Sequence, residues 1–138
     1  MIKDDLTIVI NTFNSEEQIY TCIDSINQTT KILVIENSNN RNFKHHIESK
    51  YSNVECFLTG KNLGYAKGNN YGLSKVKSRY ALILNPDTTL EPETINNFLI
   101  TASKINDFAI IAPAKQDERS EEVLLDQNNL IEVEHVKG

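Results

Sequence analysis

No run of about 18 apolar residues, the length that crosses a bilayer, occurs in the 138-residue sequence. The first five residues also lack the long apolar segment of a signal peptide. A basic excess is missing as well: the formal net charge is −5, which argues against a general nucleic-acid binder. We therefore expect a cytoplasmic protein with no membrane span and no nucleic-acid partner. A phosphate ligand stays possible, because backbone amides and a metal can hold it.

Cysteine is scarce too. Cys22 and Cys56 lie far apart and form no CxxC pair, so we expect two buried thiols in a reducing compartment. The three histidines, His45, His46 and His135, lack the spacing of metal ligands and are expected at the surface.

The chain has the composition of one folded domain. Hydrophobic residues make up 39% and charged residues 24%, which does not match the signature of disorder. A chain of this length supports one core, and we predict a single domain over residues 1–138.

Short apolar runs alternate with helical patterns along the chain. We predict strands over residues 6–10, 32–35, 54–58, 80–84 and 108–112, and a last one over 130–136. Helices are predicted after a cap at Asn14 or Ser15, over 43–50 and 65–75, and from Pro92 onward. This alternation predicts an α/β fold: a Rossmann-like, open, mostly parallel sheet with helices on both faces.

Ligands of such sheets bind at the carboxyl ends of the strands, where the strand order reverses. The loops at those ends cover residues 11–15, 36–40, 59–70 and 85–89, and all four are rich in polar residues.

The fourth of these loops contains Asn85-Pro86-Asp87-Thr88. Taken alone, Asn-Pro-Asp is an ordinary turn former. At the end of a buried strand, however, the Asp87 carboxylate can hold one Mg²⁺ or Mn²⁺, whose shell is completed by water and substrate phosphate.

The stretch from Asn62 to Gly72 holds three glycines and three asparagines but matches neither GxGxxG nor a P-loop. It has two equally weighted interpretations. One is a glycine turn entering a closely packed helix. The other is a backbone that approaches a ligand at a helix N-terminus.

Two strand ends offer candidate contacts to a base. Thr12 and Phe13 either line a base pocket or simply precede a helix cap. Glu36 is either a solvated carboxylate or an acceptor for the imide N–H of a pyrimidine.

These segments, in this order, resemble the family 2 glycosyltransferases with the GT-A fold. The 7–14 stretch resembles the opening strand and nucleotide turn of that family, and Glu36 stands where its second strand usually has Asp. The 62–72 and 84–88 stretches resemble the rhamnosyltransferase-like branch, the latter at the place of the DXD metal motif. Asn85 replaces the first Asp of that motif, which puts the metal affinity in doubt.

The resemblance implies an enzyme that transfers a sugar, such as rhamnose from dTDP-rhamnose, with inversion, to a polysaccharide or lipid-linked acceptor at the cell surface. It implies Mg²⁺ or Mn²⁺ as cofactor, with Asp87 as the metal ligand. The implied nucleotide-binding residues are Thr12, Phe13, Asn14, Glu36, Asn62, Gly64, Gly68, Asn69, Asn70 and Asn85.

In the family, a carboxylate of the second half is the catalytic base, and no residue of this sequence fits that role. We therefore expect a chain truncated before that half, either self-associating or supplied with it in trans, and peripheral at the membrane at most. One alternative is an inactive module that binds a nucleotide sugar. A weaker one is a sugar nucleotidyltransferase, for which the glycine-rich basic signature after the first strand is missing.

Overall fold

The computed structural model describes residues 5–105 and 107–113, with a boundary between two compact units after Ile95. The strands are β1 (Leu6–Thr12), β2 (Lys31–Glu36), β3 (Val54–Leu58) and β4 (Tyr80–Leu84). The helices are α1 (Glu16–Asp24), α2 (Arg41–Lys50), α3 (Gly64–Leu73) and α4 (Thr94–Lys104).

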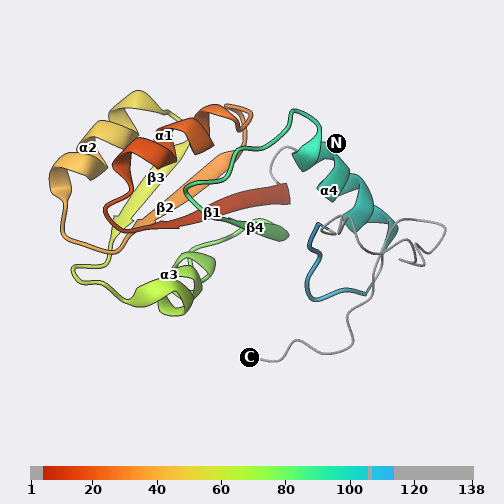
Figure 1. The fold of residues 1–138 in the computed structure, drawn as a ribbon. Coiled ribbons are helices and arrows are strands. Elements are labelled where there is room, and N and C mark those ends of the chain that lie inside the picture. The colour runs from red at the N-terminus through yellow and green to blue at the C-terminus, as the bar shows by residue number, and fades with distance from the viewer. Residues whose placement is uncertain (1–4, 106, 114–138) are drawn as a thin grey trace, which may run out of the picture. The chain divides into compact units, whose positions relative to one another are not determined.

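The four strands form one parallel sheet in the order β3-β2-β1-β4. Helices α1 and α2 lie on one face of this sheet and α3 lies on the other (Figure 1). The strand order runs outward from β1 to β3 on one side and jumps to β4 on the other, so it reverses at β1. This confirms the predicted Rossmann-like α/β fold, and it makes the carboxyl end of β1 the switch point, the place where doubly wound sheets bind ligands.

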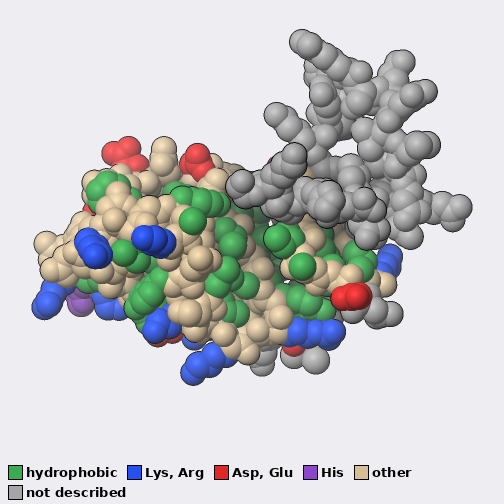
Figure 2. Space-filling model, turned by 90° about the horizontal axis from the view of Figure 1, so that it is seen from below, with side chains coloured by type: hydrophobic (Ala, Val, Ile, Leu, Met, Phe, Trp, Pro, Cys, Tyr) green, Lys and Arg blue, Asp and Glu red, His purple; other side chains and the backbone are tan. Residues whose placement is uncertain are grey.

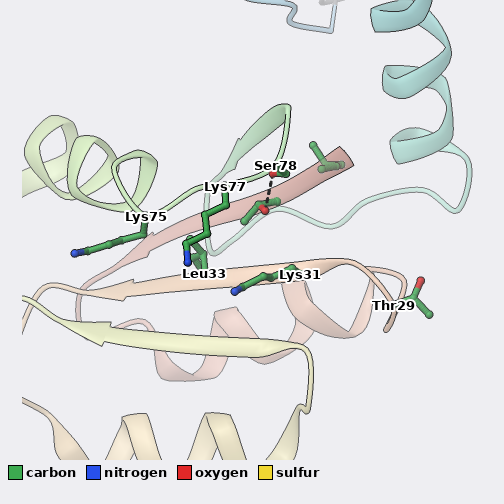
Figure 3. Close-up of a pocket in the computed structure, with 8 residues that line it drawn as sticks. Thr29, Lys31, Leu33, Lys75, Lys77 and Ser78 are labelled. Atoms are coloured by element: carbon green, nitrogen blue, oxygen red, sulfur yellow. Dashed lines mark hydrogen bonds between the residues drawn. The ribbon is translucent and has the colours of Figure 1, made fainter. Parts of the chain in front are cut away.

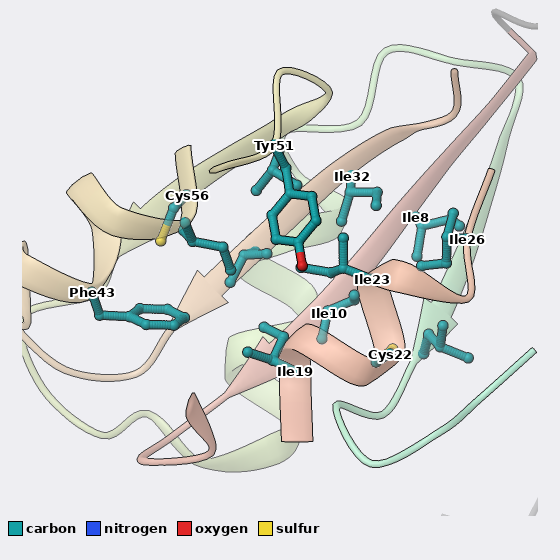
Figure 4. Close-up of a cluster of buried hydrophobic side chains, with 14 residues drawn as sticks. Ile8, Ile10, Ile19, Cys22, Ile23, Ile26, Ile32, Phe43, Tyr51 and Cys56 are labelled. Atoms are coloured by element: carbon teal, nitrogen blue, oxygen red, sulfur yellow. The ribbon is translucent and has the colours of Figure 1, made fainter. Parts of the chain in front are cut away.

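The two central strands read as continuous apolar runs because both of their faces are covered. All seven residues of β1 are buried, as are all residues of β2 after Lys31. On one face, side chains of β1 and β2 pack against α1 and α2 in the main core (Figure 4). The other face meets α3, which comes so close that a Cβ on Gly72 would lie 2.4 Å from Val9 Cγ1.

The helices begin near the predicted positions, with one difference in capping. Asn40 caps α2, since its side-chain oxygen accepts from Phe43 N at 3.0 Å. Ser15 holds the capping position of α1 but accepts nothing there, and its hydroxyl donates to Phe13 O at 3.2 Å instead. Asn14 is in the left-handed region with φ of 53°. The turn into α1 is therefore shaped by backbone conformation rather than by a side-chain cap.

One predicted strand is absent. Residues 108–112 form no strand, and Ile110 is 75% exposed. A short apolar run becomes a strand only where a neighbouring edge offers ladder hydrogen bonds, and among the described residues the sheet has four strands without this one. The strand predicted over residues 130–136 lies outside the described residues.

Side chains of α2 cover the outer edge of β3. The Lys44 ammonium donates to Cys56 O, and Glu48 Oε1 accepts from Cys56 N at 2.8 Å. Lys44 and Glu48 also pair with each other at 2.6 Å. Both backbone groups of Cys56 are thus occupied at the edge of the sheet, which is one of the ways in which proteins prevent edge-to-edge pairing.

The remaining composition-based predictions agree with the structure where it describes them. Cys22 and Cys56 are buried free thiols, and His45 and His46 are exposed. His135 lies outside the described residues. No helix in the described part of the chain is long and apolar enough to cross a membrane.

Candidate functional site

The carboxyl ends of the strands gather most of the predicted residues at one edge of the sheet. The register pairs Thr12 with Glu36 and Ile10 with Leu84, so Asn85 follows β4 beside the end of β1. The ladder continues past the strand ends, because Asn37 N donates to Thr12 O at 2.8 Å. The loops predicted to meet at this edge therefore do meet there.

The side chain of Asn11 joins this edge to α3. Its Nδ2 donates to Tyr65 O at 3.0 Å and lies 3.4 Å from Gly64 O, while its Oδ1 accepts from Asn37 Nδ2. Asn11 and Asn37 are both buried, at 8% and 2% exposure. The first turn of α3 is thus held by polar groups in a dry environment, where hydrogen bonds are strong and costly to leave unmade.

Asn37 extends the same network toward β3. Its Oδ1 accepts from Leu63 N at 3.3 Å and lies 3.4 Å from the hydroxyl of Thr59. Asn62 contributes at the surface, since its Oδ1 accepts from Gly64 N at 2.8 Å. Leu63 and Gly64 are therefore tied to the ends of β2 and β1, and Asn62 is tied to Gly64.

Two glycines of α3 allow the helix to approach the sheet. A Cβ on Gly68 would lie 2.5 Å from Asn11 Oδ1, a distance that real Cβ atoms essentially never show. Gly72 meets Val9 and Ile35 as closely one turn later. The close-packing interpretation of this glycine-rich stretch is correct for both residues. Gly64 differs, because its φ of 78° lies in the left-handed region that favours glycine.

Two buried polar side chains at this edge have no hydrogen-bond partner among residues 5–105 and 107–113. The atoms concerned are Thr12 Oγ1 and both Oδ1 and Nδ2 of Asn69. Thr12 is 3% exposed and Asn69 is 4% exposed. Because an unpaired buried polar group costs about 1–3 kcal/mol, such groups in a folded protein call for an explanation, and a ligand is one.

Glu36 is buried, at 3% exposure, so the solvated interpretation of this carboxylate is wrong. The sequence shows a carboxylate at a strand end, but it does not show that the fold buries this carboxylate beside Ser38. Burial raises the pKa of Glu36, a hydrogen bond from Ser38 opposes this, and the charge of Glu16 adds to it. Register places Glu36 on the same face as Thr12, the face that α1 and α2 cover.

The residues after β4 form a turn, with Thr88 N donating to Asn85 O at 3.1 Å. The Cys22 thiol also donates to Asn85 O at 3.6 Å, which ties the turn to α1. Burial raises the pKa of Cys22 to about 11, and the nearby negative charge of Asp87 contributes. Asp87 itself is exposed. Among the described residues, no three His, Cys, Asp or Glu side chains are placed to hold a metal.

The other predicted residues differ in their setting. Phe13 is 46% exposed, and Asn14, Asn62, Asn70 and Asn85 are exposed as well. They lie at the rim of the strand-end site rather than inside it. Asn70 points away from the sheet, since the inward face of α3 carries its neighbours Gly68, Asn69 and Gly72.

Sequence reasoning did not single out Asn11, Asn37 and Thr59, although they hold the site together. Asn11 directly follows the buried apolar run of β1, and Asn37 comes one residue after that of β2. A polar residue at that place in a doubly wound sheet was the available signal.

The family model described as "Glycosyl transferase family 2" matches residues 7–134. The chain belongs to this family. Its match begins in β1 and includes every strand and every residue of the site. The family resemblance seen in the sequence is thereby confirmed.

This family 2 glycosyltransferase chain has a curated relative of similar sequence. It is 30% identical over 114 residues to the low-salt glycan biosynthesis hexosyltransferase Agl10 of Haloferax volcanii, and the match covers 80% of this chain. The chain spans about a third of that relative, 36% of its length.

Among solved structures, the family 2 chain is similar to TarS of S. aureus. The TM-score is 0.63 at 17% identity to the crystal structure of TarS 1-349, with 78% of this chain and 38% of that chain covered. The structure of TarS 1-349 in complex with UDP gives the same values. At this identity the likeness shows the fold alone.

Proposed function

We propose that this chain forms the donor-binding part of a glycosyltransferase that takes a sugar from a nucleoside diphosphate sugar. The observation that carries the proposal is the pair of unpartnered buried side chains, Thr12 and Asn69, at the switch point of the sheet. A nucleotide would supply the hydrogen bonds that these groups lack in the free protein.

The two faces of the sheet would make different contacts with the nucleotide. Thr12 and Glu36 lie on the α1 side, where the Glu36 carboxylate would accept the imide N–H of a pyrimidine base. Asn69 lies on the α3 side, next to the glycine that packs on Asn11. A thymine or uracil base fits this arrangement, and we propose dTDP-rhamnose as the donor on the strength of the sequence resemblance.

Asp87 would be the protein ligand of a divalent metal. One exposed carboxylate in a tight turn suits Mg²⁺ or Mn²⁺, which typically bind one or two protein carboxylates and take their other ligands from water and phosphate oxygens. A metal held there supplies positive charge to the leaving diphosphate. Since Asp87 stands alone among the described residues, this site forms only together with the nucleotide.

Calorimetry tests the proposal. The chain is titrated with dTDP, UDP and GDP, with and without Mn²⁺, and the titrations are repeated with Asp87→Ala. Glu91→Ala is the matched control, because Glu91 is an exposed carboxylate on the same loop. We expect one nucleotide to bind more tightly with Mn²⁺, Asp87→Ala to abolish that gain, and Glu91→Ala to keep it. Failure of all three nucleotides to bind would refute the donor site.

A second measurement separates catalysis from binding. The chain is incubated with dTDP-rhamnose and lipid-linked or polysaccharide acceptors, and released nucleoside diphosphate is quantified. Release supports the transferase. Binding without release favours the alternative of a module that holds a nucleotide sugar and catalyses nothing.

The proposal extends to assembly and location. We propose that the chain self-associates or meets a further acceptor-binding half, and that it works in the cytoplasm at the inner face of the membrane. Sedimentation at increasing concentration checks self-association, and a clean monomer throughout counts against it.

A further inference from the structure

A cavity of about 240 Å³ lies at the opposite end of the sheet from the candidate site (Figure 3). It opens between the starts of β1 and β2 and the segment that precedes β4. Its walls are formed by Leu6, Thr7, Thr29, Lys31, Leu33, Lys75, Lys77 and Ser78. Five residue steps separate Thr7 in the cavity wall from Thr12 at the end of β1, so about 17 Å of strand lies between them.

The cavity lies beyond the end of α3 on its face of the sheet. The helix packs on Val9 and Ile35 through Gly72, then ends at Leu73, and the chain leaves the sheet before returning as β4. The start of that face is left to Thr7 and Leu33, which are buried at 4% and 1% exposure. Figure 2 looks at this side of the molecule and shows lysine and arginine side chains spread around hydrophobic ones.

Positive charge converges on the cavity. The side chains of Lys31 and Lys77 extend toward one another across it, while Lys75 points away from both (Figure 3). Lys31 pairs with Glu55 at 3.1 Å. Within residues 5–105 and 107–113, no carboxylate forms an ion pair with Lys77. Three lysines and one carboxylate leave two excess positive charges in a chain whose net charge is −5.

The neutral groups of the cavity are already satisfied. The Ser78 hydroxyl lies 2.8 Å from Tyr80 O and 2.7 Å from Thr7 Oγ1. Because a carbonyl only accepts, Ser78 donates to Tyr80 and Thr7 donates to Ser78. Lys75 is held over the rings of Tyr71 and Phe57, with Nζ 5.0 Å and 5.9 Å from their centroids. Within residues 5–105 and 107–113, the cavity donor without an ion-pair partner is therefore the Lys77 ammonium, while Lys31 shares its ammonium with Glu55.

We propose that this cavity binds a phosphate monoester group, held by Lys77 and Lys31 with Lys75 at the rim. A dianionic phosphate matches the two excess charges, and lysine is a common phosphate ligand in proteins. The volume equals that of about eight water molecules, enough for a phosphate and a few attached atoms but not for a whole donor nucleotide. The site is independent of Glu36, Asn69 and Asp87, so it does not rest on the proposed function.

The test is an NMR titration of the chain with inorganic phosphate and with glycerol 3-phosphate. We expect saturable shifts of the Thr7, Lys31 and Ser78 amides that weaken as salt is added. Lys77→Gln should weaken binding about tenfold, the loss typical of a hydrogen bond to a charged group. Lys104→Gln makes the same change of net charge on α4 and should leave the affinity unchanged. A thermal midpoint for each variant verifies that it folds.

Glu55→Gln should change the affinity for phosphate in the direction opposite to Lys77→Gln. Without the carboxylate, Lys31 is released to the ligand, so binding should tighten, whereas a merely structural ion pair predicts no gain. Equal weakening by Lys77→Gln and Lys104→Gln, or the absence of saturable shifts with both probes, would overturn the proposal.

Vesicles identify the source of the phosphate. Flotation compares phosphatidylcholine vesicles with vesicles that also contain phosphatidic acid, whose headgroup is a phosphate monoester. Lys77-dependent recruitment to the second kind, reversed by glycerol 3-phosphate, assigns the site to a lipid headgroup. Saturable binding of the soluble probes without recruitment assigns it to a free phosphate ester.

Discussion

Gly68 lies directly against Asn11: a Cβ at Gly68 would come within 2.5 Å of Asn11 Oδ1 and 2.6 Å of its Nδ2. Asn11 in turn holds the backbone carbonyl of Tyr65 and the side chain of Asn37. A side chain at position 68 would therefore disturb a buried hydrogen-bond network as well as the close packing of α3 on the sheet.

Gly68→Ala should destabilise the chain by about 1–3 kcal/mol, because the added methyl must displace Asn11 from its buried partners. Urea unfolding measures the loss. Asn70→Ala, on the exposed face of the same helix, is the control and should change stability by less than about 0.5 kcal/mol. Because alanine favours a helix more than glycine or asparagine does, helix propensity predicts no loss in either variant. A loss in Gly68→Ala no larger than that in Asn70→Ala would show that the methyl is accommodated without displacing Asn11.

Asn69→Leu should separate stability from binding. The side-chain amide is buried and unpaired, so replacing it by an apolar group of similar size should leave the free energy of unfolding unchanged or raise it. The same change should weaken the binding of the nucleotide that the chain prefers. Urea unfolding and calorimetry on one preparation check both. A large loss of stability would mean that Asn69 is satisfied within the fold and has no need of a ligand.

Glu36→Gln should alter the pH dependence of stability. Burial raises the pKa of Glu36 above its ordinary 4.5, so the folded state favours the neutral carboxyl. Its contribution to stability is present below pH 4.5 and is lost as the pH rises through the folded-state pKa. The free energy of unfolding of Glu36→Gln, relative to that of the wild type, should therefore increase as the pH rises from 4 to 7. Urea midpoints across that range measure the gain, and exposed Glu17→Gln should show none.

The two thiols should label slowly and respond differently to Asp87. Burial raises the pKa of Cys22 to about 11 and that of Cys56 to about 12, so neither is a thiolate at pH 8. Asp87→Asn removes a charge that raises the pKa of Cys22 only. Iodoacetamide labelling followed by peptide mass spectrometry should show faster modification of Cys22 in the variant, with Cys56 as the internal control. Unchanged labelling of Cys22 would place Asp87 farther from it than the structure does.

The strands of the sheet were predictable where sequence and environment agree. Runs such as Ile32 to Ile35 are apolar throughout because both faces of the sheet are covered, and the exposed Asn85 follows β4 directly. Residues 108–112 have the same composition, yet no strand forms there. Composition describes what a strand can bury, whereas pairing depends on whether the segment is aligned along an edge of the sheet, which a local pattern does not encode.

The location of the site was predictable from the sequence, but its hydrogen bonds and the burial of its side chains were not. The rule that ligands bind at strand ends selected the four loops, and the structure brings them together around Thr12 and Glu36. The hydrogen bond between Asn11 and Asn37 joins residues 26 positions apart. Neither it nor the burial of Glu36 follows from any local spacing, because both depend on how separate loops fold over one another.

The ion pair of Lys44 and Glu48 bears on where a further strand can join the sheet. Because these two side chains occupy both backbone groups of Cys56, a strand added beside β3 would first have to displace them. At the opposite margin, no described strand pairs with the outer side of β4, where Ile83 is 42% exposed. An additional strand would therefore meet an obstacle beside β3 that has no counterpart beside β4 in the described part of the chain.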